Sequence, residues 1–306
     1  MEDNKTTHQE HHSPGTKASD WYDKWYKKLL VIPVIVMILS LVYLGYFYTQ
    51  HHDFVLKDTS LSGGTTITIN TEIDSNALES SLKSSFPDIT IRKLTDITTG
   101  KATSLIIETS SLPDQIKPAI EEFLGYELTD KNSTIEFTGP SLSQSFYKQL
   151  IFALIISFIL MSITVFIIFR TFTPSIAVIF AVLGDIIIPL SIINIIGMRV
   201  SAAGIAAFLM LIGYSVDTDI LLTTRALRTK GGTLNSRIYR AFKTGIFITT
   251  TAIVAVLPAF LLMSGLPDSF RQIFFILALG LFADIFNTWL TNASIIKWYC
   301  VKRRIE

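Results

Sequence analysis

Long apolar runs separated by short polar segments dominate the chain. Six runs reach the roughly 20 residues that a helix needs to cross a bilayer at about 1.5 Å rise per residue. The pattern therefore predicts six transmembrane helices. The first follows the basic stretch KWYKKLL and lacks a signal-peptide cleavage site, so we expect it to remain as an anchor. The predicted spans are Leu29–Tyr48, Leu150–Phe169, Pro174–Ile196, Ser201–Thr223, Phe242–Met263 and Gln272–Ile295.

The segment between the first two spans has the pattern of a water-soluble domain. TTITIN, DITIRK, TSLIIE and STIEFT are alternating or β-branched runs of strand length. DSNALESSLKSSF is predicted to be helical with Asp74 or Ser75 as its cap, and SLPDQIKPAIEEFL predicts a helix that Pro118 weakens. The resulting order, βαββαβ, is that of a ferredoxin-like sheet. The expected fold is a mainly α membrane protein with an α+β domain between helices one and two.

These patterns divide the chain into five parts. The polar N-terminus, residues 1–24, is expected to be a disordered tail because it offers little apolar surface to bury. The first transmembrane helix is expected over residues 25–48, the α+β domain over 49–149, a five-helix transmembrane segment over 150–297 and a second tail over 298–306.

Basic residues give the predicted orientation, because they concentrate on the cytoplasmic side of membrane proteins. Three clusters agree under a six-span topology, so both termini are expected in the cytoplasm of a plasma-membrane protein and residues 49–149 outside. The clusters are Lys24, Lys27 and Lys28 before span one; Arg225, Arg228, Lys230, Arg237, Arg240 and Lys243 between spans four and five; and Lys297, Lys302, Arg303 and Arg304 after span six.

Composition fits this topology and narrows the possible functions. The 306 residues are 49% hydrophobic and 17% charged, a balance typical of a polytopic membrane protein. The net charge of +1 gives no reason to expect a nucleic-acid partner. The single cysteine, Cys300, forms no internal disulfide, and all five histidines lie outside the apolar runs. No P-loop, zinc spacing or nucleophile elbow is present, so no enzyme activity, metal or cofactor is predicted.

Four aspartates lie inside the predicted spans, where each ionisable side chain costs about 2.5 to 3.5 kcal/mol. They are Asp185 in span three, Asp217 and Asp219 in span four, and Asp284 in span six. Helical rise places Asp185, Asp217 and Asp284 about 16, 12 and 20 Å from the cytoplasmic ends of their spans, which is one layer of the membrane. Asp217 and Asp219 point about 200° apart and cannot face the same partner.

Two roles are open for these acids. Each could be a structural group hydrogen-bonded to Ser or Thr, or a group that exchanges protons when water reaches it. Acids at similar depth on three spans favour a proton-responsive helix bundle. Lys243 either compensates one carboxylate or extends to the membrane surface. Small residues in span four would allow close helix packing: Ser201, Ala202, Ala203, Gly204, Gly213 and Ser215.

The stretch GYSVDTDILLTTRALR resembles the fourth-span signature of the SecD and SecF family, auxiliary subunits of the Sec protein-export machinery in the resistance–nodulation–division superfamily. Asp217 aligns with the SecD aspartate, whereas Thr218 stands where bacterial SecF has one. LGDIII, with Asp185, resembles the third-span segment of SecF, and FKTGIFITTTAIVAV places Lys243 where the family has arginine. The matching motif residues are Gly213, Tyr214, Ser215 and Arg225 in span four, and Gly139 and Pro140 in FTGPSLSQSF, while LSGGTTITI resembles the family's FxGGT stretch.

The resemblance implies six spans, a large extracytoplasmic loop and a role in protein export. GLFADIFNTWLTNA points to the archaeal SecF branch of the family. Implied partners are a SecD-like six-span subunit, the Sec translocon channel and translocating polypeptides, all within the lipid bilayer. Asp217, with Asp219, Asp185 and Asp284, would be the proton-coupling candidates, and Lys243 or Arg225 their charge partners.

Two other classes of membrane protein remain to be considered. A lipid or small-molecule transporter of the same superfamily would normally have twelve spans and a larger outer domain. An intramembrane aspartyl protease needs two facing aspartates. Asp185 and Asp217 offer such a pair, but Val182 stands where the protease motif has glycine and its Tyr-Asp pair is absent.

Overall fold

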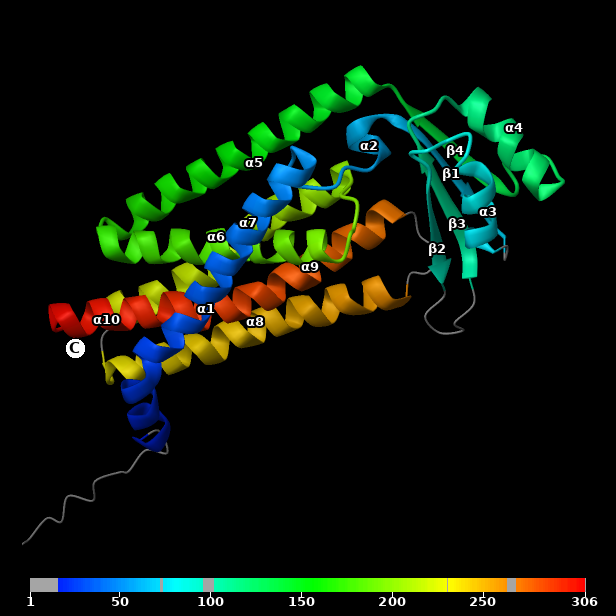
Figure 1. The fold of residues 1–306 in the computed structure, drawn as a ribbon. Helices are drawn as coiled ribbons and strands as arrows, with labels where there is room; N and C mark the ends of the chain where they lie inside the picture. Colours follow the sequence, from blue (N-terminus) through cyan, green and yellow to red (C-terminus); the bar gives the residue numbers. More distant parts are fainter. Residues whose placement is uncertain (1–15, 72–73, 96–101, 230, 263–267, 306) are drawn as a thin grey trace, which may run out of the picture.

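The computed structural model describes residues 16–71, 74–95, 102–229, 231–262 and 268–305. Long helices run side by side, and a small sheet with two covering helices lies at one end of them (Figure 1). Within the described residues, six helices are long and apolar enough to cross a membrane, which confirms the six predicted spans.

The spans are helices of 24 residues or more. Their bounds are α1 Thr16–His51, α5 Pro140–Phe169, α6 Phe172–Ile195, α7 Ala202–Arg228 and α8 Leu234–Leu262, while the sixth combines α9 Asp268–Phe286, a π-helical segment η1 Asn287–Asn292 and α10 Ala293–Arg303. Helix α7 packs against α5, α6, α8 and α9 and forms the centre of the bundle.

The expected disordered tail over residues 1–24 is wrong for its described part, because α1 already begins at Thr16; residues 1–15 lie outside the described residues. Contacts with α10 hold this early part of the helix. The Lys297 ammonium lies 2.6 Å from the Asp23 carboxylate and 3.9 Å from the centre of the Tyr22 ring. Tertiary contact therefore orders a segment that is too polar to be recognised from hydropathy.

Other helix ends also differ from the predicted boundaries. The connection expected from Arg225 to Lys243 is mostly helical, since α7 continues to Arg228 and α8 begins at Leu234. Likewise, α5 begins at Pro140 and α10 reaches Arg303, into the tail expected over residues 298–306. Hydropathy marks the apolar slab of the bilayer, and these helices extend beyond it.

The small domain is a four-stranded sheet with two helices on one face (Figure 1). Its strands β1 Gly64–Ile69, β2 Thr90–Thr95, β3 Ala102–Thr109 and β4 Ser133–Thr138 form the order β2-β3-β1-β4 with every neighbouring pair antiparallel. Helix α3 Ser75–Leu82 follows β1, and α4 Pro113–Leu124 follows β3. As expected, Asp74 caps α3, because its Oδ1 accepts from the Asn76 amide at 3.1 Å.

Side chains alternate across this sheet, as the period of two requires. Ile67, Ile69, Leu105 and Ile107 lie on the covered face and pack with buried residues of α3 and α4. The opposite face carries polar side chains, among them Glu108. A short helix that the sequence did not indicate, α2 Thr59–Ser62, connects α1 to β1 beside that polar face.

Candidate functional site

Three of the four intramembrane aspartates lie in one buried polar network between α6, α7, α8, α9 and η1. The side chains of Asp185 and Asp219 are 0% exposed and that of Asp284 is 1% exposed. Within the described residues, none of the three makes an ion pair with Lys or Arg. Their partners are hydroxyl and amide groups.

Asp185, near the middle of α6, is held by donors from two other helices. Its Oδ2 accepts a short hydrogen bond from the Ser215 hydroxyl of α7, and its Oδ1 accepts from the Asn287 amide of η1 at 2.6 Å. Gly184 makes this approach possible, because a Cβ there would lie 2.7 Å from the Asn287 Nδ2. The carboxyl group of Asp185 thus joins three elements.

Asp284 of α9 is surrounded by threonines. The Thr218 hydroxyl lies 3.0 Å from its Oδ1, and the Thr288 hydroxyl 3.1 Å from the same oxygen. The Thr249 hydroxyl of α8 donates to Oδ2 at 3.3 Å. Each threonine has one hydroxyl proton, and that of Thr218 is shared with the Ser215 carbonyl at 2.9 Å, so a carboxylate here would have at most three neutral donors.

The carboxyl group of Asp219, in α7, is hydrogen-bonded by the π-helical segment η1. Its Oδ1 accepts from the Asn292 amide at 2.7 Å, while its buried Oδ2 has no hydrogen-bond partner in the described part of the chain. Asn287 and Asn292 are five residues apart, which in an α-helix separates two side chains by about 140°. The i→i+5 pattern of a π-helix brings such residues toward one face, and π-helical turns often occur at functional sites. Both amides therefore reach acids of the same network.

Asp217 lies outside this network. It belongs to an exposed stripe of α7 with Met210, Gly213 and Tyr214, residues that recur every three or four positions and so share one face. Tyr214 is 50% exposed. The structure thus places Asp217 and Asp219 on opposite faces, as their spacing required, and brings Asp219, rather than Asp217, to Asp185 and Asp284.

Neither proposed charge partner makes an ion pair with these acids in the described part of the chain. Lys243 is exposed on α8. Arg225 instead joins the ends of α7 and α8, because its Nη1 donates to the Arg240 carbonyl at 3.0 Å and to the Thr244 hydroxyl at 3.1 Å.

The remaining motif residues fall in two places. Ser215 belongs to the acid network, whereas Gly139 and Pro140 begin α5 where the sheet joins the bundle. There Gly63, at a φ of 84°, packs so closely on Pro140 that an added Cβ would overlap the Pro140 backbone. The LSGGT and GP segments therefore meet at the base of the small domain.

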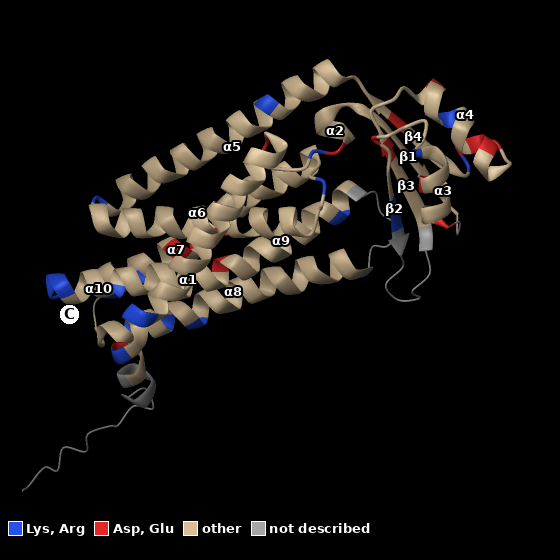
Figure 2. Cartoon of the chain, in the orientation of Figure 1, with Lys and Arg blue, Asp and Glu red and all other residues tan. Residues whose placement is uncertain are grey.

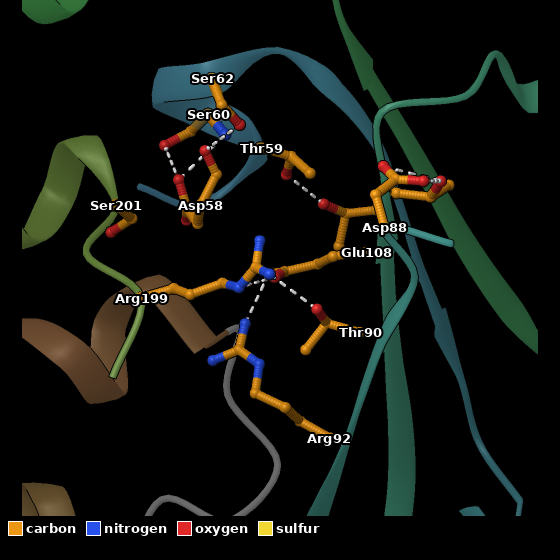
Figure 3. Close-up of polar contacts among 12 residues, drawn as sticks. Asp58, Thr59, Ser60, Ser62, Asp88, Thr90, Arg92, Glu108, Arg199 and Ser201 are labelled. Carbon is orange, nitrogen blue, oxygen red and sulfur yellow. Dashed lines mark hydrogen bonds and ion pairs between the residues drawn. The ribbon is translucent and has the colours of Figure 1, made fainter. Parts of the chain in front are cut away.

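A second polar cluster lies on the sheet face opposite α3 and α4 (Figure 3). Glu108, 3% exposed, pairs with Arg92 at 2.5 Å and lies 3.9 Å from the Nε of Arg199, which comes from the α6–α7 connection. Arg199 also donates to the Thr90 hydroxyl at 2.7 Å. The connection between two acid-bearing helices is therefore bound directly to the sheet.

Asp58 strengthens the same junction. Its backbone N–H donates to the Val200 carbonyl at 3.1 Å, and its Oδ1 accepts from the Ser60 amide at 2.9 Å and hydroxyl at 2.6 Å. Burial raises the pKa of the Asp58 carboxyl from its ordinary 3.8 to about 6. Its protonation therefore changes in a mildly acidic range.

Sequence reasoning missed the amide and threonine members of the acid network. Thr249 and Thr288 are ordinary helix residues in sequence. Asn287 and Asn292 were visible as polar residues within a predicted span, but an α-helical pattern would have put them on different faces. The only signal was their polarity at depth, which is costly unless it is satisfied.

Comparisons with known proteins agree with this architecture. The family model for the protein export membrane protein SecD/SecF, C-terminal, matches residues 121–302. The protein-export membrane protein SecF of Methanocaldococcus jannaschii is 35% identical over 92% of this chain and 99% of its own length. That of Methanolacinia petrolearia is 34% identical over 90% of this chain and 94% of its own length.

A solved structure shows the same fold. The crystal structure of SecDF, a translocon-associated membrane protein from Thermus thermophilus, aligns over 90% of this chain with a TM-score of 0.74 and 18% identity. This chain spans 38% of the length of that one. The fold defines a polytopic membrane protein of the SecDF type. The chain belongs to the SecD/SecF family of protein-export membrane proteins, and the two archaeal relatives above carry the name SecF.

Proposed function

We propose that this protein is the SecF-type auxiliary subunit of a Sec export system and acts in proton-coupled movement of its small domain. Family membership, six spans and SecF relatives over nearly the full chain support the export role. The observation that carries the coupling mechanism is the network of Asp185, Asp219 and Asp284, three fully buried acids on three helices without a cation among the described residues.

The small domain is proposed to be ferredoxin-like and extracytoplasmic. Its strand order and antiparallel pairing support the fold assignment. Lys and Arg residues gather at the other end of the bundle, near the starts of α1 and α8 and the end of α10 (Figure 2). Because basic residues favour the cytoplasmic side, this distribution supports an external sheet and cytoplasmic termini.

The buried acids are proposed to bind and release protons. An isolated carboxylate charge in an apolar interior is energetically costly. Each buried acid must therefore keep its proton, pair with a cation, or lose its proton only when the helices rearrange around it. Asp185 and Asp284 accept hydrogen bonds from two or three other helical segments, and Asp219 accepts one from η1. A change of proton occupancy therefore changes the contacts between α6, α7 and α9.

The junction gives these movements a route to the small domain. Arg199, in the connection between α6 and α7, donates a hydrogen bond to the Thr90 hydroxyl and lies beside the Glu108 carboxylate. Backbone bonds from Val200 to Leu56 at 2.6 Å and from Asp58 to Val200 at 3.1 Å add a second attachment. A shift of α6 relative to α7 would thus be transmitted to the sheet, which we propose contacts the emerging polypeptide near the Sec channel.

The exposed stripe of α7 is the proposed binding face for a SecD-like subunit. Asp217 on this stripe would cost about 2.5 to 3.5 kcal/mol if it faced lipid alone. A partner helix removes that cost by supplying a hydrogen-bond donor or access to water. The greater length of the solved SecDF chain is consistent with a second six-span half in the assembly.

Export assays with variants of the acids test the coupling proposal. In cells that lack the chromosomal gene, Asp284→Asn is expected to insert and co-purify with its partner but to reduce export of a secreted reporter severalfold. Residual export should respond less to a protonophore, because Asn at position 284 cannot titrate while Asp185 and Asp219 remain. Asp114→Asn on the exposed surface of α4 is the control. Normal protonophore-sensitive export by Asp284→Asn would remove this acid from coupling.

Cysteine cross-linking tests the partner face. Cys300 is buried, so a cysteine introduced at Tyr214 should be the main reactive thiol in the described part of the chain. Tyr214→Cys is expected to cross-link to the co-purified subunit, whereas Leu160→Cys, exposed on α5, serves as the control. Cross-links from position 160 with none from position 214 would place the partner elsewhere.

A further inference from the structure

A cavity of about 210 Å³ lies between the ends of α7 and α8, on the side of the bundle away from the sheet. Its lining includes Arg225, Thr229, Arg237 and Arg240. Three arginine side chains therefore line one small space. Pockets for drug-sized organic ligands are usually larger, about 300 to 1,000 Å³, so this one suits a small group.

Arg237 is unusual among these residues because it is charged and yet only 3% exposed. Its Nη1 donates to the Thr229 carbonyl at 2.7 Å. Its Nε and Nη2 are buried and have no hydrogen-bond partner among the residues that the structure describes. A buried charged group with two unsatisfied donors is costly, and native structures normally supply an acceptor.

The described residues near the cavity do not supply the missing negative charge. Arg225 and Arg240 donate to backbone carbonyls, and Arg225 also to the Thr244 hydroxyl. Asp23, an acid at the same end of the bundle, is already engaged by Lys297 at 2.6 Å and Asn235 at 2.9 Å. Among the described residues, no ion pair neutralises the three arginines of the cavity.

We propose that this cavity is a phosphate-binding site that joins the ends of α7 and α8. The guanidinium group presents donors in a planar fork that matches phosphate oxygens, and several arginines can share one phosphate. The two unsatisfied donors of Arg237 would supply hydrogen bonds to the phosphate, and Arg225 and Arg240 would neutralise its remaining charge. Neither the buried acids nor the proposed partner face takes part in this site.

The surroundings place the cavity at the level of lipid headgroups. Tyr239 and Phe242, which lie close to Arg237 and Arg240 in the sequence of α8, are exposed, and so is Trp298 of α10. Aromatic side chains of this kind concentrate at the membrane–water interface. Basic pockets between transmembrane helices bind anionic lipid headgroups, so the phosphate has two sources, a phospholipid or free phosphate.

The test uses the purified full-length protein and its tryptophan fluorescence during thermal unfolding. One arm adds inorganic phosphate against chloride at fixed ionic strength in lipid-free detergent. The other compares nanodiscs of phosphatidylglycerol with nanodiscs of phosphatidylcholine. A ligand that binds only the folded state raises the unfolding temperature in a saturable way. Arg237→Gln and Arg240→Gln remove one charge each, and Arg303→Gln removes a charge outside the cavity lining.

We expect the unfolding temperature of the unmodified protein to rise with phosphate, phosphatidylglycerol or both. Arg240→Gln should weaken the apparent affinity about tenfold or more, and Arg303→Gln should leave it unchanged. A response to phosphatidylglycerol alone identifies the lipid as the source, and a response to free phosphate identifies the ion. No response in either arm, or equal losses in Arg240→Gln and Arg303→Gln, would overturn the proposal. Arg240 is exposed, so its variant remains informative if Arg237→Gln does not fold.

Discussion

Gly184 offers a direct test of the acid network, because its effect can be worked out from one contact. A methyl group at this position would lie 2.7 Å from the Nδ2 and 3.0 Å from the Cγ of Asn287. Gly184→Ala must therefore displace the Asn287 side chain from Asp185. Overpacking of this kind costs about 1 to 3 kcal/mol. Loss of the hydrogen bond to a carboxyl group adds about 1.5 to 3 kcal/mol.

The opposing term is the helix preference of alanine over glycine, about 0.5 to 1 kcal/mol. The net expectation is a loss of about 1.5 to 5.5 kcal/mol in the free energy of unfolding. Thermal unfolding in detergent measures this as a drop of several degrees. Gly45→Ala is the matched control, because Gly45 lies within the span α1 and a Cβ there would have no neighbour within 4 Å. That variant should be as stable as the unmodified protein or slightly more stable.

A double variant separates the steric effect from a general effect of alanine. In an Asn287→Ala background the obstructing amide is absent, so adding Gly184→Ala should cost little or nothing. Strong non-additivity of this type is expected only for residues in contact. Equal stability of Gly184→Ala and Gly45→Ala, or a full additional loss in the double variant, would refute the proposed contact between α6 and η1.

Two further predictions concern the junction and the topology. The folded-state pKa of Asp58, about 6, lies above its ordinary 3.8, so the free energy of unfolding should fall by about 3 kcal/mol as pH rises from about 4 to about 6. Asp58→Asn, which keeps the acceptor for Ser60, should flatten this part of a stability–pH curve measured with denaturant; an unchanged slope would assign the titration to another group. A cysteine at Ser236, exposed near the start of α8, should react with an impermeant maleimide only from the cytoplasmic side, because Cys300 is buried. Labelling of intact cells from outside would reverse the proposed orientation.

The spans and the strands were predictable because each has a strong local signal. Twenty apolar residues can satisfy their backbone only as a helix in the bilayer. The strand runs TTITIN and STIEFT fall on β1 and β4, and the Asp74 cap forms where it was expected. Helix ends were less predictable, since Asp23 orders the start of α1 only through Lys297, which is far away in sequence.

The arrangement of the site was harder to predict. Spacing alone showed that Asp217 and Asp219 face opposite directions, but in an apolar span hydropathy does not distinguish the lipid face from the protein face. Which acid points inward is decided by the packing of α7 among its neighbours. The pairing of Asn292 with Asp219 depends further on a π-helical turn, for which the sequence carries no clear local signal.

The π-helical segment also has a consequence for movement. It accommodates an extra residue, and conversion to α-helical geometry would twist everything after it by about 100° and advance it by about 1.5 Å. The amide now at Asp219 would swing away, while the one at Asp185 stayed near its place. The same twist would rotate α10 and strain the ion pair between Lys297 and Asp23 of α1. Release of the Asn292 amide from Asp219 and rotation of α10 would then occur together, as parts of one backbone change.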